Sequence, residues 1–116
     1  MHELLSAYTF AGGDKWDLAR KFGLPVNDVM AWLRGDEIPE KLLSRLEHEA
    51  HDQVQRRYTD LLEKAPVSEN NLADPEWIKT LLGLDKAFWI LYGISVFEFR
   101  LRVALRLLRE APYDEY

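Results

Sequence analysis

Ala19 and Gly23 lie four residues apart, between two short segments whose apolar residues recur at helical spacing. Two helices that cross steeply need a small side chain where they touch, and Ala19 supplies one. The tight turn that follows needs a residue free to take a positive φ, and Gly23 supplies it. Five apolar residues fall at spacings that fix both helices onto one core: Leu18, Phe22, Leu24, Val29 and Trp32. This pattern predicts two short helices joined by a tight turn.

The rest of the chain also favours helices, because apolar spacing near 3.6 recurs and sustained period-2 alternation does not. The fold class is therefore expected to be all-α. In the first half, glycines and prolines delimit three short helices. These are Glu3–Phe10, ended by Gly12 and Gly13, then Lys15–Phe22 with Asp14 as N-cap, then a helix from Pro25 to Leu33 or Arg34 that stops at Gly35.

A long helical segment follows Pro39 and is expected to run from Glu40 to about Lys64. Its middle, His48–Gln53, is polar on nearly every side, so the helix is expected to leave the core there or to bend. The stretch Ala65–Pro75 has the composition of a linker. Three further helices are predicted after it: Glu76–Leu82, Asp85–Tyr92, and one from Ser95 to about Glu110, where Ser95 and Glu98 fit a capping box.

A chain of 116 residues has room for one domain, or for one small domain with an appended helical piece. The expected division is a first domain over 1–48, a helix and linker over 49–75, and a C-terminal helical region over 76–116. The three parts could also form one continuous domain. Apolar residues make up 47% of the chain, which is enough for a real core. The four tryptophans, five tyrosines and five phenylalanines are expected to lie mostly in it.

Several functional classes are disfavoured by what the sequence lacks. There is no cysteine, so disulfides, thiolate metal sites and cysteine nucleophiles are excluded. No apolar run reaches the roughly 18 residues of a membrane span. The segment Met1–Phe10 carries Glu3 where a signal peptide would be positively charged. A cytoplasmic protein without membrane attachment is expected.

The charge balance weighs on any interaction with nucleic acid. The formal net charge is −5, whereas DNA-binding proteins usually show a basic footprint. From Asp14 to His48, however, seven acidic residues face six basic ones. The first half is therefore near neutral, and the excess acid lies in the middle of the chain and at the Tyr113–Tyr116 tail.

The segment from Lys15 to Gly35 (KWDLARKFGLPVNDVMAWLRG) resembles the helix-turn-helix of the lambda-repressor-like family, which includes Cro- and Xre-type regulators. The resemblance extends upstream to the first helix with its glycine-containing loop. It extends downstream through Trp32–Leu42, where a glycine loop and Pro39 precede the next helix. It covers about residues 3–48, and it implies a lambda-repressor-like helix-turn-helix followed by a long helix and a C-terminal helical extension.

This resemblance implies binding of double-stranded DNA, with a recognition helix of about Val26–Leu33 in the major groove. Asn27 would pair with adenine, while Asp28 would weaken binding unless it accepts from cytosine or caps the helix. Lys15 and Trp16 would meet phosphate, helped by the positive N-terminal dipole of their helix, and Lys41 would add another phosphate contact after the loop. The full set of expected DNA contacts is Lys15, Trp16, Val26, Asn27, Met30, Ala31, Arg34 and Lys41.

Two functional hypotheses follow. The first is a sequence-specific transcriptional regulator of bacterial or phage type that acts as a homodimer. The second is a helical protein–protein interaction module, an inhibitor or adaptor, that keeps the helix-turn-helix as a scaffold. The recognition face supports the second hypothesis as well, because Val26, Met30 and Ala31 are apolar and Asp28 is acidic.

The last predicted helix carries the densest positive charge. Arg102, Arg106 and Arg109 share one face with Glu98. This face could bind phosphate or an acidic ligand, but a solvated face with a Glu98–Arg102 pair is the simpler interpretation. The opposite apolar face is wider than a surface helix needs, which suggests dimerisation. The candidate interface residues are Phe97, Arg100, Leu101, Arg102, Leu105 and Arg106.

Arg100 falls in the middle of that apolar face on a helical wheel. It is expected to pair with a nearby acid or to reach solvent, the alternative being an anchor for an interface or an acidic ligand. His48, His51 and Asp52 share a helix face but lack a third strong ligand and the zincin spacing, so a solvated polar face is preferred to a metal site. No nucleophile constellation or phosphate loop is present. Neither enzymatic activity nor a cofactor is therefore expected.

Overall fold

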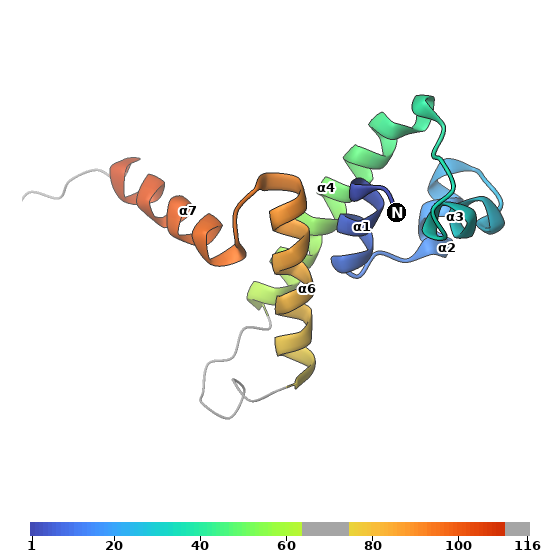
Figure 1. Ribbon diagram of the computed structural model, residues 1–116. Helices are drawn as coiled ribbons and strands as arrows, with labels where there is room; N and C mark the ends of the chain where they lie inside the picture. Colours follow the sequence, from blue (N-terminus) through green and yellow to red (C-terminus); the bar gives the residue numbers. More distant parts are fainter. Residues whose placement is uncertain (64–74, 111–116) are drawn as a thin grey trace, which may run out of the picture.

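The computed structural model describes residues 1–63 and 75–110, and the regular secondary structure in these ranges is entirely α-helical. This confirms the all-α class. The helices are α1 (Glu3–Phe10), α2 (Lys15–Phe22), α3 (Val26–Leu33), α4 (Glu40–Glu63), α6 (Pro75–Tyr92) and α7 (Val96–Glu110) (Figure 1). The predicted linker Ala65–Pro75, apart from Pro75 itself, and the acidic tail lie outside the described residues.

The boundaries of α2 are set locally, as the sequence predicts. The Asp14 carboxylate accepts a hydrogen bond from the Trp16 amide at 3.2 Å and caps the N-terminus. At the other end Gly23 has a φ of +66°, a left-handed conformation that glycine adopts without strain. The Leu24 amide then donates to the Ala19 carbonyl at 3.0 Å, which closes the turn toward α3.

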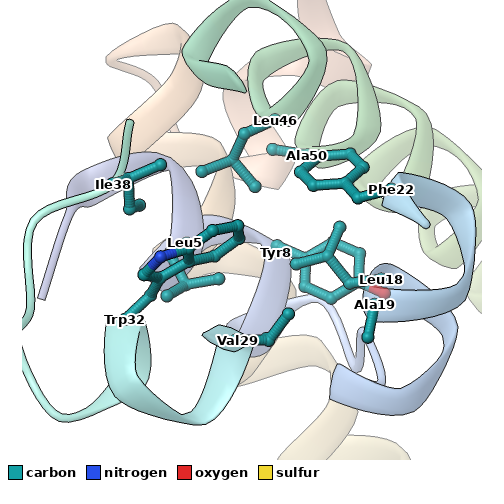
Figure 2. Packing of buried hydrophobic residues seen from close by; sticks show 10 residues of the cluster. All are labelled: Leu5, Tyr8, Leu18, Ala19, Phe22, Val29, Trp32, Ile38, Leu46 and Ala50. Atoms are coloured by element: carbon teal, nitrogen blue, oxygen red, sulfur yellow. The ribbon is translucent and has the colours of Figure 1, made fainter. Parts of the chain in front are cut away.

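The first half of the chain packs around one hydrophobic cluster, which we call the N-terminal core (Figure 2). It joins α1, α2, α3 and the first half of α4. Ala19 is buried in it, as expected for the contact between steeply crossing helices. Its buried members are Leu5, Tyr8, Leu18, Ala19, Phe22, Val29, Trp32, Ile38, Leu46 and Ala50.

A second cluster, which we call the C-terminal core, joins α1, α4, α6 and the first turn of α7. Its buried members are Ala7, Ala11, Val54, Leu61, Leu84, Ala87, Phe88 and Val96. Helix α1 contributes to both cores, and α4 runs through both. The boundary expected at residue 48 therefore falls inside α4.

The polar stretch of α4 does not leave the core, which corrects one expectation. Ala50 and Val54 are both completely buried, and α4 is continuous across the stretch. Two small apolar residues suffice here because α1 packs against this part of α4. His51 Nδ1 lies 3.1 Å from the hydroxyl of Tyr92 on α6, and Gln53 donates to the carbonyl of Ala11, at the end of α1, at 3.0 Å.

A second correction concerns α6, which is one helix of 18 residues and not two helices broken near Gly83. The glycine is explained by packing. A Cβ placed on Gly83 would lie 2.7 Å from the carbonyl oxygen of Phe10, at the C-terminal end of α1. Gly83 therefore permits a close approach between two helices and does not interrupt either of them.

Helix α7 begins where it was predicted to begin. The Ser95 hydroxyl accepts from the Glu98 amide at 3.0 Å, and the Asp85 carboxylate accepts from the Val96 amide at 2.9 Å. Among the described residues, no single helix has both the length and the apolarity of a membrane span. Helices α6 and α7 reach the length and apolarity of a membrane span only when they are taken together, and they are bent by 69° relative to each other.

Candidate nucleic-acid interface on α3

Helix α3 lies at one end of the elongated molecule, where it packs against α2 (Figure 1). Val29 and Trp32 point into the N-terminal core and are buried (Figure 2). Trp32 contacts the ring of Phe22 with a centroid distance of 6.3 Å. These contacts fix the rotation of α3 about its axis and so determine which face it presents outward.

The outward face is the one predicted to contact DNA. At about 100° per residue, its five residues fall within an arc of about 140° opposite Val29 and Trp32. Asn27 and Arg34 are exposed, and the other three are half-buried. Val26 also touches the edge of the N-terminal core. The five residues are Val26, Asn27, Met30, Ala31 and Arg34.

Lys15 lies along one side of α3. It lines a cavity of about 220 Å³ between α1, α2 and α3, together with Val29 and Leu33. Its neighbour Trp16, also a predicted DNA contact, is 60% exposed. Both residues belong to the first turn of α2, where the Asp14 carboxylate already caps the Trp16 amide.

Lys41 lies along the opposite side of α3. It lines a groove of about 310 Å³ with Ala31 and Trp32 of α3 and with residues of the loop that precedes α4. The predicted recognition helix thus has one lysine on each side, and Arg34 directly follows its C-terminal end.

These three cations differ from the other basic residues nearby. Within the described ranges, the side chains of Lys15, Arg34 and Lys41 form neither an ion pair nor a hydrogen bond. By contrast, Arg20 pairs with Asp17, and Lys21 pairs with Glu49 at 2.9 Å. The cations around α3 are therefore the ones that are available for an external anion.

Arg45 is likewise engaged inside the molecule. Its guanidinium donates to the Lys21 carbonyl at 2.9 Å and lies 4.7 Å from the centre of the Phe22 ring. It helps to hold α2 against α4.

Acidic residues border the groove on the Lys41 side. Asp28, Asp36 and Glu37 all line it, and all three are exposed. Asp28 was expected to weaken DNA binding unless it accepts from a cytosine or caps α3. The helix begins at Pro25 without a side-chain cap, so Asp28 does not serve as one. The surface around α3 is consequently mixed in charge: Lys15 shares its cavity with Asp14, and Lys41 shares the groove with the three acids.

The predicted interface residues of α7 are at the other end of the molecule from α3 (Figure 1). All six are exposed, and Arg102 forms the expected i,i+4 ion pair with Glu98 at 2.9 Å. Arg100 is exposed to solvent, which was one of the two outcomes expected for it. It lines a cleft of about 170 Å³ with Trp77 and Phe97. The structure thus keeps the two predicted sites apart.

Two features of the structure were not predicted. The tryptophans are less buried than expected, since Trp16 and Trp89 are more than half exposed. Trp89 shares an exposed stripe of α6 with Ile78 and Leu82, and the spacing of these three residues was the signal available in the sequence.

The histidine cluster of α4 has a structural role at one position. His51 contacts the Tyr92 ring edge-on at 5.2 Å. Within residues 1–63 and 75–110, no three His, Asp or Glu side chains lie close enough together to hold a metal ion.

The chain was also compared with protein-family models, with curated proteins and with solved structures, and it matches none of them.

Proposed function

We propose that this protein is a cytoplasmic, sequence-specific DNA-binding regulator that inserts α3 into the major groove of double-stranded DNA. The observation that carries the proposal is the arrangement of cations around α3. Lys15 and Lys41 lie on its two sides, Arg34 follows its end, and none of the three is engaged within the described molecule. A helix in the major groove has a phosphate backbone on each side, so such a pair of lysines suits it.

The outward face of α3 supports a limited direct readout. Asn27 is exposed and can make two hydrogen bonds to adenine. Ala31 and Val26 offer apolar contacts of the kind that thymine methyl groups make. Because only one amide is present, we expect a short recognition sequence per chain and a modest preference over other sequences.

The first test compares two lysines that are expected to contact phosphate with one asparagine that is expected to contact a base. Lys15→Gln and Lys41→Gln should weaken binding to all sequences alike, and each should reduce the slope of log K against log salt by about 0.9. Asn27→Ala should leave the slope unchanged and cost roughly 1–3 kcal/mol on the preferred sequence alone. The affinity and its salt slope are both measured by fluorescence anisotropy of labelled duplexes, over a salt range of roughly 50 to 200 mM.

Lys86→Gln is the matched control, because it removes the same charge from α6 and not from the surroundings of α3. The Nζ atom of Lys86 lies 5.3 Å from the centre of the Phe10 ring. It should change neither the affinity nor the slope. If Lys86→Gln weakened binding as much as Lys15→Gln, the charge effect would be general and the placement of DNA on α3 would be wrong.

The acidic groove gives the alternative function a specific basis. Asp28, Asp36 and Glu37 surround an apolar floor that includes Leu24 and Trp32. A protein segment with basic and apolar side chains would suit this groove, and the chain would then act as an interaction module. The two functions predict opposite effects of neutralising these acidic side chains: the affinity for DNA should rise, whereas the affinity for a basic protein segment should fall.

A further inference from the structure

Most of α7 has no neighbour within the described molecule. Beyond its first turn the helix projects away from the body (Figure 1). Six of its large apolar side chains are between 40% and 77% exposed: Phe97, Leu101, Val103, Leu105, Leu107 and Leu108. Isolated apolar residues are common on protein surfaces, but these six gather on one short helix, with the exposed Arg100 among them.

This patch is unusually wide. At about 100° per residue, the apolar residues of α7 cover an arc of about 240°, whereas an ordinary surface helix shows a stripe of roughly 100°. Glu98, Arg102, Arg106 and Arg109 occupy the remaining sector. A face of this width favours a contact with a surface outside the described part of the chain.

Helix α6 presents a second uncovered apolar surface. Ile78, Leu82 and Trp89 fall within an arc of about 40°, and they are 39%, 58% and 55% exposed. Leu84 and Phe88 lie about 140° and 100° around the helix from the centre of this stripe, and both are completely buried in the C-terminal core. Among the described residues, the stripe therefore lies outside the C-terminal core.

Helix α7 is held so that it does not cover the stripe on α6. The Asp85 carboxylate fixes the Val96 amide at 2.9 Å, and Phe99 packs edge-on against Phe88 at 5.1 Å. Gly93 takes a φ of +69° at the connection, and the two helices diverge by 69°. Within the described residues, α7 packs against α6 mainly through its first turn.

We infer that a second copy of this chain covers both surfaces, with α7 of each chain lying along the Ile78–Leu82–Trp89 stripe of its partner. Such a contact is reciprocal, as a twofold-symmetric dimer requires, because each chain supplies one stripe and receives one helix. The inference does not depend on DNA binding. It goes beyond the general expectation of a dimer by pairing the α7 face with a surface on α6.

The exposed area is of the size that a stable dimer needs. At roughly 100 Å² for each half-exposed large apolar side chain, the nine residues of the two surfaces present on the order of 900 Å². A stable interface buries about 800 Å² on each partner.

Charge distinguishes this occupant from a membrane. A bilayer with anionic lipids would attract the arginines of α7, but it would repel the rest of a chain whose net charge is −5. It would also leave the stripe on α6 unexplained. A second copy covers both surfaces and leaves Arg102 and Arg109 in solvent, on the polar sector of α7.

The first experiment measures the mass of the full chain in solution by light scattering after gel filtration and by sedimentation velocity. The wild type should have twice the 13.6 kDa mass of one chain. Leu82→Glu on α6 and Leu105→Glu on α7 should each give the single-chain mass at the same concentration, because a buried unpaired carboxylate opposes association. Both side chains are exposed in the single chain, so the circular dichroism should be unchanged.

Arg109→Gln is the matched control on the same helix and should remain dimeric, since Arg109 lies on the polar sector. A wild type that stays at 13.6 kDa at all accessible concentrations would overturn the inference. So would a monomer that sediments with vesicles of phosphatidylglycerol and phosphatidylcholine through α7, because the membrane would then be the occupant.

The second experiment tests which helices meet, and it uses the absence of cysteine from the chain. Leu82→Cys is oxidised in an equimolar mixture with Leu101→Cys, Leu105→Cys or Leu108→Cys, each in turn. At least one mixture should form more disulfide-linked dimer than either of its single variants alone. A higher yield from an α7 variant alone would show that α7 pairs with α7 and would overturn the proposed arrangement.

Discussion

Tyr8 connects α1 to the start of α2 through its side chain. Its ring is buried in the core, and its hydroxyl donates to the Asp14 carbonyl at 2.8 Å, immediately before α2 (Figure 2). The ring lies so close to Gly13 that a Cβ there would overlap it. Burial raises the pKa of Tyr8 to about 12, and the charges of Asp17, Asp14 and Glu49 act in the same direction.

This raised pKa makes stability depend on pH in the alkaline range. The contribution of Tyr8 is fully present below its ordinary pKa of about 10. Between pH 10 and pH 12 the folded protein keeps a proton that the unfolded chain releases, so the free energy of unfolding falls as the pH rises through this interval. Tyr8→Phe should lose less stability over the interval, although it should be about 1 kcal/mol less stable at pH 7. Urea unfolding at several pH values measures both effects, and an equal alkaline loss in the two proteins would contradict this account.

At the scale of elements, the position of α1 against α6 depends on the absence of a side chain at Gly83. The Phe10 carbonyl occupies the space that a Cβ would take, and this carbonyl belongs to the backbone of α1, which cannot rotate away as a side chain could. The contact brings Ala7 and Ala11 against Ala87 in the C-terminal core. Small residues on both helices therefore allow the close approach.

Gly83→Ala should destabilise the protein although alanine is the better helix former. In an exposed helix the substitution would add about 1 kcal/mol of stability. Here the overlap with Phe10 should cost roughly 1–3 kcal/mol, so the net effect should be a loss. Chemical denaturation gives the sign directly. A gain of about 1 kcal/mol would mean that α1 does not approach α6 as closely as described.

At the scale of the whole molecule, the sequence predicted features that depend on neighbouring residues and missed those that depend on distant ones. The bounds of α1, α2 and α3 were predicted because caps and glycines such as Asp14 and Gly23 act within a few residues. Gly83 was misinterpreted as a break, because its partner Phe10 is 73 positions earlier in the chain. For the same reason the sequence did not show that Ala50 and Val54 would keep α4 in the core.

The candidate site divides in the same way. The face of α3 that points outward followed from helical spacing and from the turn at Gly23. The positions of Lys15 and Lys41 on opposite sides of that face depend on how α2 and α4 pack around it, which the sequence indicated only through a resemblance. The apolar stripe on α6 was missed because Trp89 was expected in the core.

The most direct test of the central proposal removes two negative charges from the groove beside α3. Asp36→Asn combined with Glu37→Gln leaves Lys41 and the outward face of α3 unchanged. If DNA lies on α3, each lost charge should relieve a repulsion of roughly 0.5 kcal/mol, and the affinity for duplex DNA at low salt should rise about fivefold. An unchanged or reduced affinity for DNA, or a wild type without measurable DNA binding at low salt, would contradict the proposal and favour a protein partner in the groove.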